Sequence, residues 1–258
     1  MLNYIKAELW KVSRRRGFYA AAGVFLGLTH LFGFMYTGDS FEHLVHGVCA
    51  TMLTGFAAAP VLVQLVDGRF GDTVRNEVSF GLSREEIYLG KLFSGILIGA
   101  ALCAVLVGGV LLSGWVLLDH GKEMEELRAL MILAGCLTAA LPIWCGMVGL
   151  CHMLATLIRS QSVWLCAYFL GFMFCGPLAV GALSLLAALF DAVFRFRLSL
   201  HQPHLIQSVC MPWTLLLSDR LGEQLTPAYL LLCWRVGLGW LLASSAAGLL
   251  IFRRRDIR

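Results

Sequence analysis

The chain has 258 residues, of which 59% are hydrophobic and only 14% are charged, and its mean hydropathy is +0.79. Soluble domains usually carry about a quarter charged residues, so this composition excludes an ordinary soluble protein. Several apolar runs exceed the roughly 18–20 residues that cross a hydrocarbon core, and such long runs exclude a β-barrel, whose short strands alternate. The net charge is +4, and its distribution along the chain is more informative than its total.

The first 16 residues predict an amphipathic helix lying in the membrane interface. Four apolar residues recur at steps of three and four: Leu2, Ile5, Leu9 and Val12. Three charged residues are expected elsewhere around this helix: Lys6, Glu8 and Lys11. A plain basic anchor without a mechanical role is the alternative. No small-residue cleavage site follows the first apolar run, which predicts a retained span and not a signal peptide.

The apolar pattern predicts an all-α membrane protein with six spans in a single transmembrane domain, residues 1–258. The spans are Phe18–Tyr36, Leu44–Val66, Leu92–Leu118, Ala129–Ile158, Ser162–Phe190 and Tyr229–Phe252. With a cytoplasmic N-terminus, fourteen basic residues fall in inner segments and five in outer ones. Because cytoplasmic connections are enriched in Lys and Arg, this bias predicts that both termini are cytoplasmic.

Three spans contain proline, at Pro60, Pro142 and Pro177. The fourth and fifth spans are also longer than a bilayer requires, so these helices are expected to tilt, kink or extend into the cytoplasm. A proline frees a backbone carbonyl within a span. Each proline therefore marks either a static kink or a hinge, and the sequence does not distinguish the two.

Residues 67–91 form a charged connection between the second and third spans, and we call it the elbow. Ser83 and Glu86 have the spacing of a capping box at the start of the third-span helix. Gly81 permits a sharp turn just before that cap. A passive connection needs only a few polar residues, whereas this one mixes apolar residues with charges. The pattern indicates a stiff elbow with a docking surface.

The loop 191–228 is predicted to be outside the cell and to hold two short helices that dip into the outer leaflet, one starting at Pro212. His201 and His204 have a spacing that two metal ligands can have, but no third ligand lies nearby. The nine cysteines form no metal or redox motif and are expected to be small apolar fillers. We therefore predict no metal site.

Several kinds of chemistry lack their motifs in this sequence. There is no G-x-x-x-x-G-K-[ST], so the chain is not expected to bind ATP through a P-loop, and there is no H-E-x-x-H or G-x-S-x-G. Glu85-Glu86 is a paired carboxylate near a membrane surface. However, the later spans contain a single histidine, His152, and one histidine cannot supply the metal ligands of a metalloprotease. Charges inside the spans are few, which argues against an ion-coupled carrier. His30 and His152 are interpreted as satisfied interface residues.

The elbow resembles that of the membrane subunit of an ABC-2 type exporter. In that family the elbow often reads acid–x–x–x–Gly-Thr-(Ile/Val)-Arg-Asn, then Gly-x-(Ser/Thr)-Arg, then Leu-x-x-Lys. Here Asp67 is followed by Gly71-Asp72-Thr73-Val74-Arg75-Asn76, Gly81-Leu82-Ser83-Arg84 and Ile87-Tyr88-Leu89-Gly90-Lys91. The inserted Asp72 departs from the family pattern. The ends of the chain, at Glu8-Leu9 and 252–257, are also similar, as is the long outer connection.

The resemblance implies an ABC-2 (type V) exporter fold in which 1–16 is the connecting helix and the elbow fits a groove of a separate ATPase. Its coupling residues would be Thr73, Val74, Arg75, Asn76, Gly81, Leu82, Ser83 and Arg84. ATP and Mg²⁺ would bind the partner ATPase, so this chain would be a permease without a cofactor and not itself an enzyme. A second permease copy or a related permease, and membrane lipid, would be its other partners, with no nucleic acid.

The same resemblance implies a multi-pass protein of the plasma (inner) membrane. Short permeases of this shape are similar to those that protect cells against lantibiotics and other peptide antibiotics. An amphipathic peptide or a lipid-like molecule is therefore the expected substrate. Two alternatives remain: a secondary carrier, for which we see neither buried charges nor inverted repeats, and a membrane protein that senses or binds a partner without transport.

Overall fold

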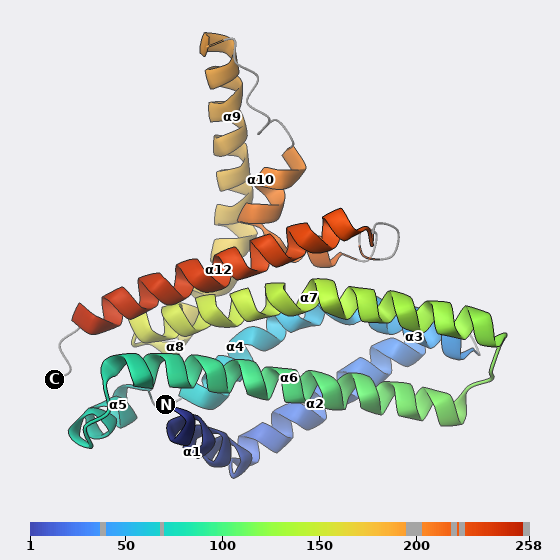
Figure 1. Cartoon of the computed structure of the whole chain (residues 1–258), viewed down its shortest axis with the longest axis horizontal. Helices are drawn as coiled ribbons and strands as arrows, with labels where there is room; N and C mark the ends of the chain where they lie inside the picture. The colour runs from blue at the N-terminus through green and yellow to red at the C-terminus, as the bar shows by residue number, and fades with distance from the viewer. Residues whose placement is uncertain (37–39, 68–69, 195–202, 218–220, 222–224, 255–258) are drawn as a thin grey trace.

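The computed structural model of the chain describes residues 1–36, 40–67, 70–194, 203–217, 221 and 225–254. Within these residues the structure is helical, without a β-strand, and five apolar segments are long enough to cross a membrane. They are α2 (Arg16–Tyr36), α3 and α4 (Phe41–Ala50 and Thr54–Asp67, joined by a 3-10 turn at Thr51–Leu53), α6 (Arg84–Leu117), α7 (Glu123–Leu157) and α12 (Pro227–Arg254). The five segments run side by side in one bundle (Figure 1).

α7 and α12 pack closely in the bundle, because small residues at their contact let the two backbones approach each other. A Cβ atom on Gly237 would lie 2.4 Å from the carbonyl oxygen of Pro142, and one on Gly146 would lie 2.7 Å from the carbonyl oxygen of Gly237. Pro142 lies inside α7, which continues as one helix on both sides of it. Pro142 therefore marks the place where α12 approaches the backbone of α7.

The paired glycines of α6 also serve packing within the chain. A Cβ atom on Gly95 would meet Val148 of α7 at 3.6 Å, and one on Gly99 would meet Leu62 of α4 at 3.0 Å. Small residues at this spacing let helices approach closely in membrane proteins. Gly95 and Gly99 therefore let α6 pack closely against α7 and α4 within the same protomer.

One end of the bundle carries both termini and the elbow, at the left of Figure 1. The Met1 amino group lies 3.5 Å from Glu86 Oε1, and Arg84 donates to the carbonyl oxygen of Arg253 over 2.8 Å. The predicted placement of N-terminus, elbow and C-terminal helix on one side is therefore confirmed. That this side is cytoplasmic stays a prediction.

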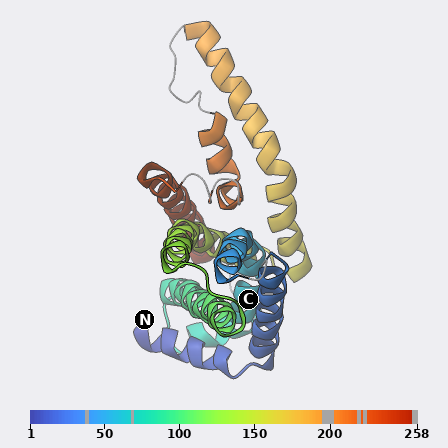
Figure 2. The same cartoon turned by 90° about the vertical axis from the view of Figure 1, so that its right-hand side faces the viewer.

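The predicted fifth span is corrected by the structure, which divides it into two helices. α8 (Gln161–Leu170) packs in the bundle, a π-helical turn follows at Gly171–Cys175, and α9 (Gly176–Phe194) stands away from the bundle (Figures 1 and 2). Pro177 has no N–H to donate to the preceding turn, and glycines flank the π turn, so the break falls here. A total of six spans stays a prediction.

The predicted short helices of the outer connection are present as α10 (Pro203–Cys210) and a 3-10 helix at Pro212–Leu216, with Pro212 in its first turn. This connection returns to the core: Leu215 and Leu216 are buried, and the Tyr229 hydroxyl donates to the Leu215 carbonyl oxygen over 2.5 Å. Apolar burial thus anchors the predicted loop to the bundle. His201 and the side chain of His204 lie outside the described residues.

Candidate functional site

The elbow consists of two helices joined by a tight turn, and the turn and the helix cap lie where they were predicted. α5 (Phe70–Ser79) ends just before Gly81, whose φ of +86° lies in the left-handed region that favours glycine. Ser83 then caps α6: its hydroxyl accepts from the Glu86 N–H over 3.2 Å, and its own N–H donates to Glu86 Oε2 over 3.2 Å. The capping box is confirmed, and it fixes the direction in which α6 leaves the turn.

Two of the eight predicted coupling residues hold the elbow against the bundle. Val74 is 3% exposed, and the half-buried Leu82 packs in the same apolar cluster. The other buried members of that cluster are Ile87, Tyr88 and Phe252. Since these residues belong to α6 and α12, the elbow does not move independently of those helices.

The outer side of the elbow exposes Asn76, Gly81 and Ser83. Phe80, between them, is 85% exposed, the largest exposed fraction among the large apolar side chains of the described residues. A phenylalanine so exposed at a tight turn has no packing role within this chain. The side chains of Thr73 and Arg75 lie outside the description.

Arg84, the eighth predicted residue, faces the end of α12 and not open solvent. Its guanidinium donates to the carbonyl oxygens of Arg253, over 2.8 Å, and Phe252, over 3.4 Å. Arg253 in turn forms an ion pair with Glu85. The last carbonyls of a helix have no partners within the helix, so Arg84 caps α12 and fastens it to the elbow.

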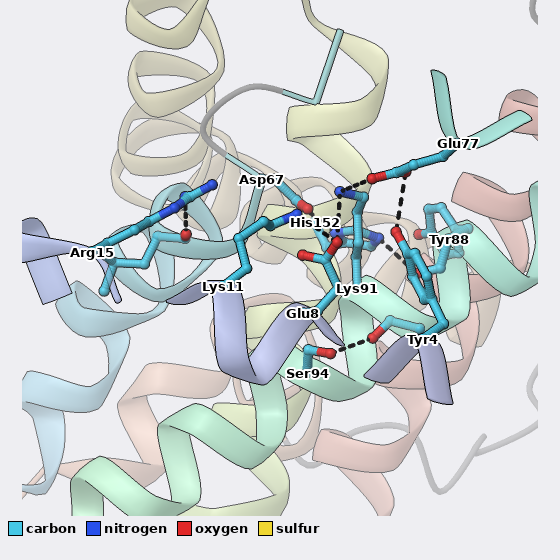
Figure 3. A network of polar contacts seen from close by, with 12 residues as sticks. Tyr4, Glu8, Lys11, Arg15, Asp67, Glu77, Tyr88, Lys91, Ser94 and His152 are labelled. Atoms are coloured by element: carbon cyan, nitrogen blue, oxygen red, sulfur yellow. Dashed lines mark hydrogen bonds and ion pairs between the residues drawn. The ribbon is translucent and has the colours of Figure 1, made fainter. Parts of the chain in front are cut away.

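Behind the elbow lies a buried group of ionisable side chains, which we call the charge cluster. Its members are Tyr4, Glu8, Lys11, Asp67, Glu77, Tyr88, Lys91 and His152. Lys91 of α6 is central and only 1% exposed; its ammonium lies 3.3 Å from Glu77 Oε1 and 3.7 Å from Glu8 Oε1 (Figure 3). One ammonium group therefore ties α1 (Leu2–Ser13), α5 and α6 together.

α1 supplies two further groups to the charge cluster. Lys11 donates to Glu8 Oε1 over 2.5 Å, and the Tyr4 hydroxyl donates to Glu77 Oε2 over 3.1 Å. Burial, together with the charges of Glu8 and Glu77, raises the pKa of Tyr4 well above its usual range. The tyrosine ring lies where a Cβ on Gly90 would be, 2.4 Å from its Cδ1 atom, so α1 sits directly on the backbone of α6.

The charge cluster extends to α4 and α7 through His152, which is 1% exposed. Its Nδ1 lies 2.5 Å from Asp67 Oδ2, and its Nε2 lies 3.1 Å from the carbonyl oxygen of Tyr88 (Figure 3). The Tyr88 ring lies 4.5 Å from the imidazole and 6.2 Å from Phe252, between centroids. Five helices thus meet in one polar network at the end of the bundle that carries the elbow.

This network was not predicted from the sequence, and the expected position of Glu8 is corrected. Glu8 was expected away from the apolar face of α1, but it is 3% exposed and points into the bundle. Asp67 and Lys91 lie just outside the predicted second and third spans, and the structure shows that both are buried. One signal was present: Glu8 lies three residues after Ile5 and four before Val12, the spacing of a single helix face.

The described residues hold no group of three or more His, Cys, Asp or Glu side chains that could bind a metal ion. The charge cluster consists of ion pairs and hydrogen bonds between ionisable side chains. A scan against protein-family models gave no match, and a search of curated proteins gave none. By fold and composition, the chain is an all-α protein with the five apolar helices of a multi-pass membrane protein.

Proposed function

We propose that this chain is the permease subunit of an ABC exporter and that the elbow receives the movement of a separate ATPase. The observation that carries the proposal is the attachment of the elbow. Its inner side is fixed to α1, α6 and α12 by Val74, Lys91 and Arg84, whereas its outer side exposes Phe80. The sequence contains no P-loop motif, which agrees with an energy source on another protein.

A displacement of such an elbow reaches the whole bundle because the contacts behind it are stiff. The capping box and the apolar cluster of Val74 and Tyr88 connect it to α6 and α12, and Glu77 connects it to α1 through Lys91. His152 continues the connection to α4 and α7. Contiguous packed side chains and ion pairs of this kind carry coupling between distant sites.

The docking surface for the ATPase is the exposed side of the elbow turn. An exposed aromatic residue surrounded by polar ones is typical of an interface anchor, and such anchors account for much of the binding energy of protein complexes. The resemblance to ABC-2 permeases supports the same face, because Asn76, Gly81 and Ser83 belong to the matching motifs and are exposed there. Arg84 would contribute by fixing the elbow to α12, since its guanidinium already binds carbonyl oxygens there.

The transport path would form between two permease subunits in the plasma membrane, with the termini in the cytoplasm. α9 supports this assignment because it stands away from its own bundle and exposes Leu178, Leu183, Leu185 and Leu186. An amphipathic peptide antibiotic or a lipid-like molecule is the substrate class that the resemblance and the apolar helices favour. The mass of the purified complex, measured by native mass spectrometry, distinguishes a pair of identical permeases from a mixed pair.

A secondary carrier is the rival class, and the charge cluster gives it one supporting feature, namely buried ionisable groups. Carriers place such groups near the middle of the membrane, at the interface of repeats. Here they gather at the end of the bundle, beside the elbow (Figures 1 and 3). That position favours a mechanical link over an ion-binding site in a transport path.

The experiment is copurification from native membranes, with ATP hydrolysis measured in the purified complex. We expect a P-loop ATPase with the wild-type chain, and about tenfold weaker association for Phe80→Ala, the loss typical of an interface anchor. Val116→Ala is the matched control, because Val116 is 73% exposed but lies near the opposite end of α6. Absence of any ATPase, or equal retention by both variants, would contradict the proposal.

A further inference from the structure

The two ring nitrogens of His152 both face hydrogen-bond acceptors. Nδ1 faces a carboxylate oxygen of Asp67 on α4, and Nε2 faces the backbone carbonyl of Tyr88 on α6 (Figure 3). A backbone carbonyl and an ionised carboxylate have no proton to donate, and a neutral imidazole has only one N–H. Both contacts are therefore satisfied only when the pair holds one extra proton, on the ring or on the Asp67 carboxyl.

The pair lies among other charged groups. On the facing elements, α1 contributes Glu8 and Lys11, α5 contributes Glu77, and α6 contributes Lys91. Arg15, which follows α1, donates to the carbonyl oxygen of Leu65 on α4. The phenols of Tyr4 and Tyr88 are further titratable groups beside the pair. Glu8 and Glu77 already pair with Lys11 and Lys91, whereas the partner of Asp67 is His152.

Burial makes a missing donor costly at this site. The side chains of His152 and Asp67 are 2% and 3% exposed, and Oδ1 of Asp67 has no hydrogen-bond partner among the described residues. An isolated charge or an unsatisfied polar group is costly in such a place. A proton shared by the pair gives both contacts of the ring a hydrogen and leaves neither side chain as an isolated charge.

We propose that His152 and Asp67 form a buried proton-binding site, and that the bound proton joins α4, α6 and α7 behind the elbow. The proton is taken from water as the bundle assembles. Its release to water leaves one hydrogen for the two contacts of the ring, so that one ring nitrogen then faces the oxygen of Asp67 or of the Tyr88 carbonyl without a hydrogen between them. Release therefore loosens the contact between α7 and its two neighbours. This inference concerns the chain alone and holds whether or not an ATPase drives it.

His30 provides an internal comparison. Its Nδ1 lies 2.9 Å from the Leu26 carbonyl oxygen, and its Nε2 lies 3.1 Å from the Ser113 hydroxyl. The Ser113 hydroxyl also lies 2.9 Å from the Val110 carbonyl oxygen, but it can turn its one hydrogen to His30 Nε2, because that carbonyl also accepts from the backbone within α6. A neutral His30 ring then satisfies both contacts. The proposal thus predicts an extra proton at His152 and none at His30, although both histidines belong to apolar helices.

The test is solid-state NMR of the full chain in lipid bilayers at neutral pH, with ¹⁵N-labelled histidine and ¹³C-carbonyl tyrosine. Dipolar coupling to the Tyr88 carbonyl identifies His152 Nε2 without any mutation, and His30→Gln identifies the comparison signal. We expect both nitrogens of His152 at imidazolium shifts. A neutral ring accompanied by an infrared band of a protonated carboxyl group that Asp67→Asn removes would place the same proton on Asp67 and also supports the site.

A neutral His152 ring together with an ionised Asp67 would overturn the proposal. In Asp67→Asn the ring loses its carboxylate partner, so we expect the imidazolium signal of His152 to be lost. Retention of that signal would equally contradict the pairing of His152 with Asp67. If this variant does not fold, the wild-type spectra still decide the question. None of these results depends on copurification of an ATPase, so the site and the proposed function are tested separately.

Discussion

Replacing Lys91 by methionine tests whether the charge cluster holds the elbow end of the bundle together. Methionine keeps the length of the side chain and removes its charge. The ammonium of Lys91 compensates two carboxylates whose side chains are 4% and 15% exposed, those of Glu8 and Glu77. Removing one partner of a buried ion pair costs about 3–5 kcal/mol, because the remaining charge is left uncompensated. We expect a destabilisation of that order.

The assay is thermal unfolding of the purified chain in one detergent. For chains of this size 1 kcal/mol corresponds to a few degrees, so Lys91→Met is expected to lower Tm by on the order of 10 °C. Lys122→Met is the matched control, because Lys122 also pairs with a glutamate, Glu125 at 3.6 Å, but its side chain is 84% exposed. Exposed pairs contribute little, so the control should show no measurable shift.

A triple variant separates uncompensated charge from lost packing. Adding Glu8→Gln and Glu77→Gln to Lys91→Met removes all three charges at once, and neutral replacement of a buried ion network is often close to neutral in stability. We expect the triple variant to regain most of the Tm that the single variant loses. If Lys91→Met behaves like Lys122→Met, or if the triple variant is no more stable than the single one, the charge cluster does not hold these helices.

Two further predictions concern the elbow turn and α1. Gly81→Ala should cost about 1–2 kcal/mol, because its φ of +86° is strained for any residue with a Cβ; Gly121→Ala, at a site equally free of neighbours but without a left-handed φ, should leave Tm unchanged, and equal effects would refute the argument from φ. The Tyr4 hydroxyl should stay protonated at the alkaline pH, about 10, at which a free tyrosine ionises, because burial beside Glu8 and Glu77 raises its pKa. Stability that depends on this neutral phenol is therefore present below that pH and is lost above it, once the unfolded chain ionises. Tyr4→Phe should leave the tyrosinate absorbance near pH 10 unchanged, whereas a loss of one tyrosinate would contradict the assignment.

The elbow was predictable because its signals are local. Ser83 and Glu86 lie three residues apart, and the left-handed turn requires a glycine at position 81, so the capping box and the bend follow from a few adjacent residues. The placement of both termini and the elbow at one end was predicted from the distribution of Lys and Arg along the chain. These features can be seen in the sequence alone, and the structure brings the three segments together.

The division of the fifth span was not predictable to the same degree. Gly176-Pro177 marked a kink, but its composition did not say that α8 would stay in the bundle while α9 leaves it. The direction of a helix after a π-helical turn depends on the surfaces available to it, such as α10 and the buried Leu215 and Leu216 that follow. Those surfaces come from distant parts of the chain.

The sequence by itself determined that the chain is helical and apolar enough for a membrane, and that its elbow is capped and bent. Only the tertiary structure decided which charges are buried. Asp67 and His152 are 85 positions apart, and Glu8 and Lys91 are contributed by helices with no local relation to each other. A buried charge is stable only beside its partner, and which side chains become partners is determined by how the helices pack.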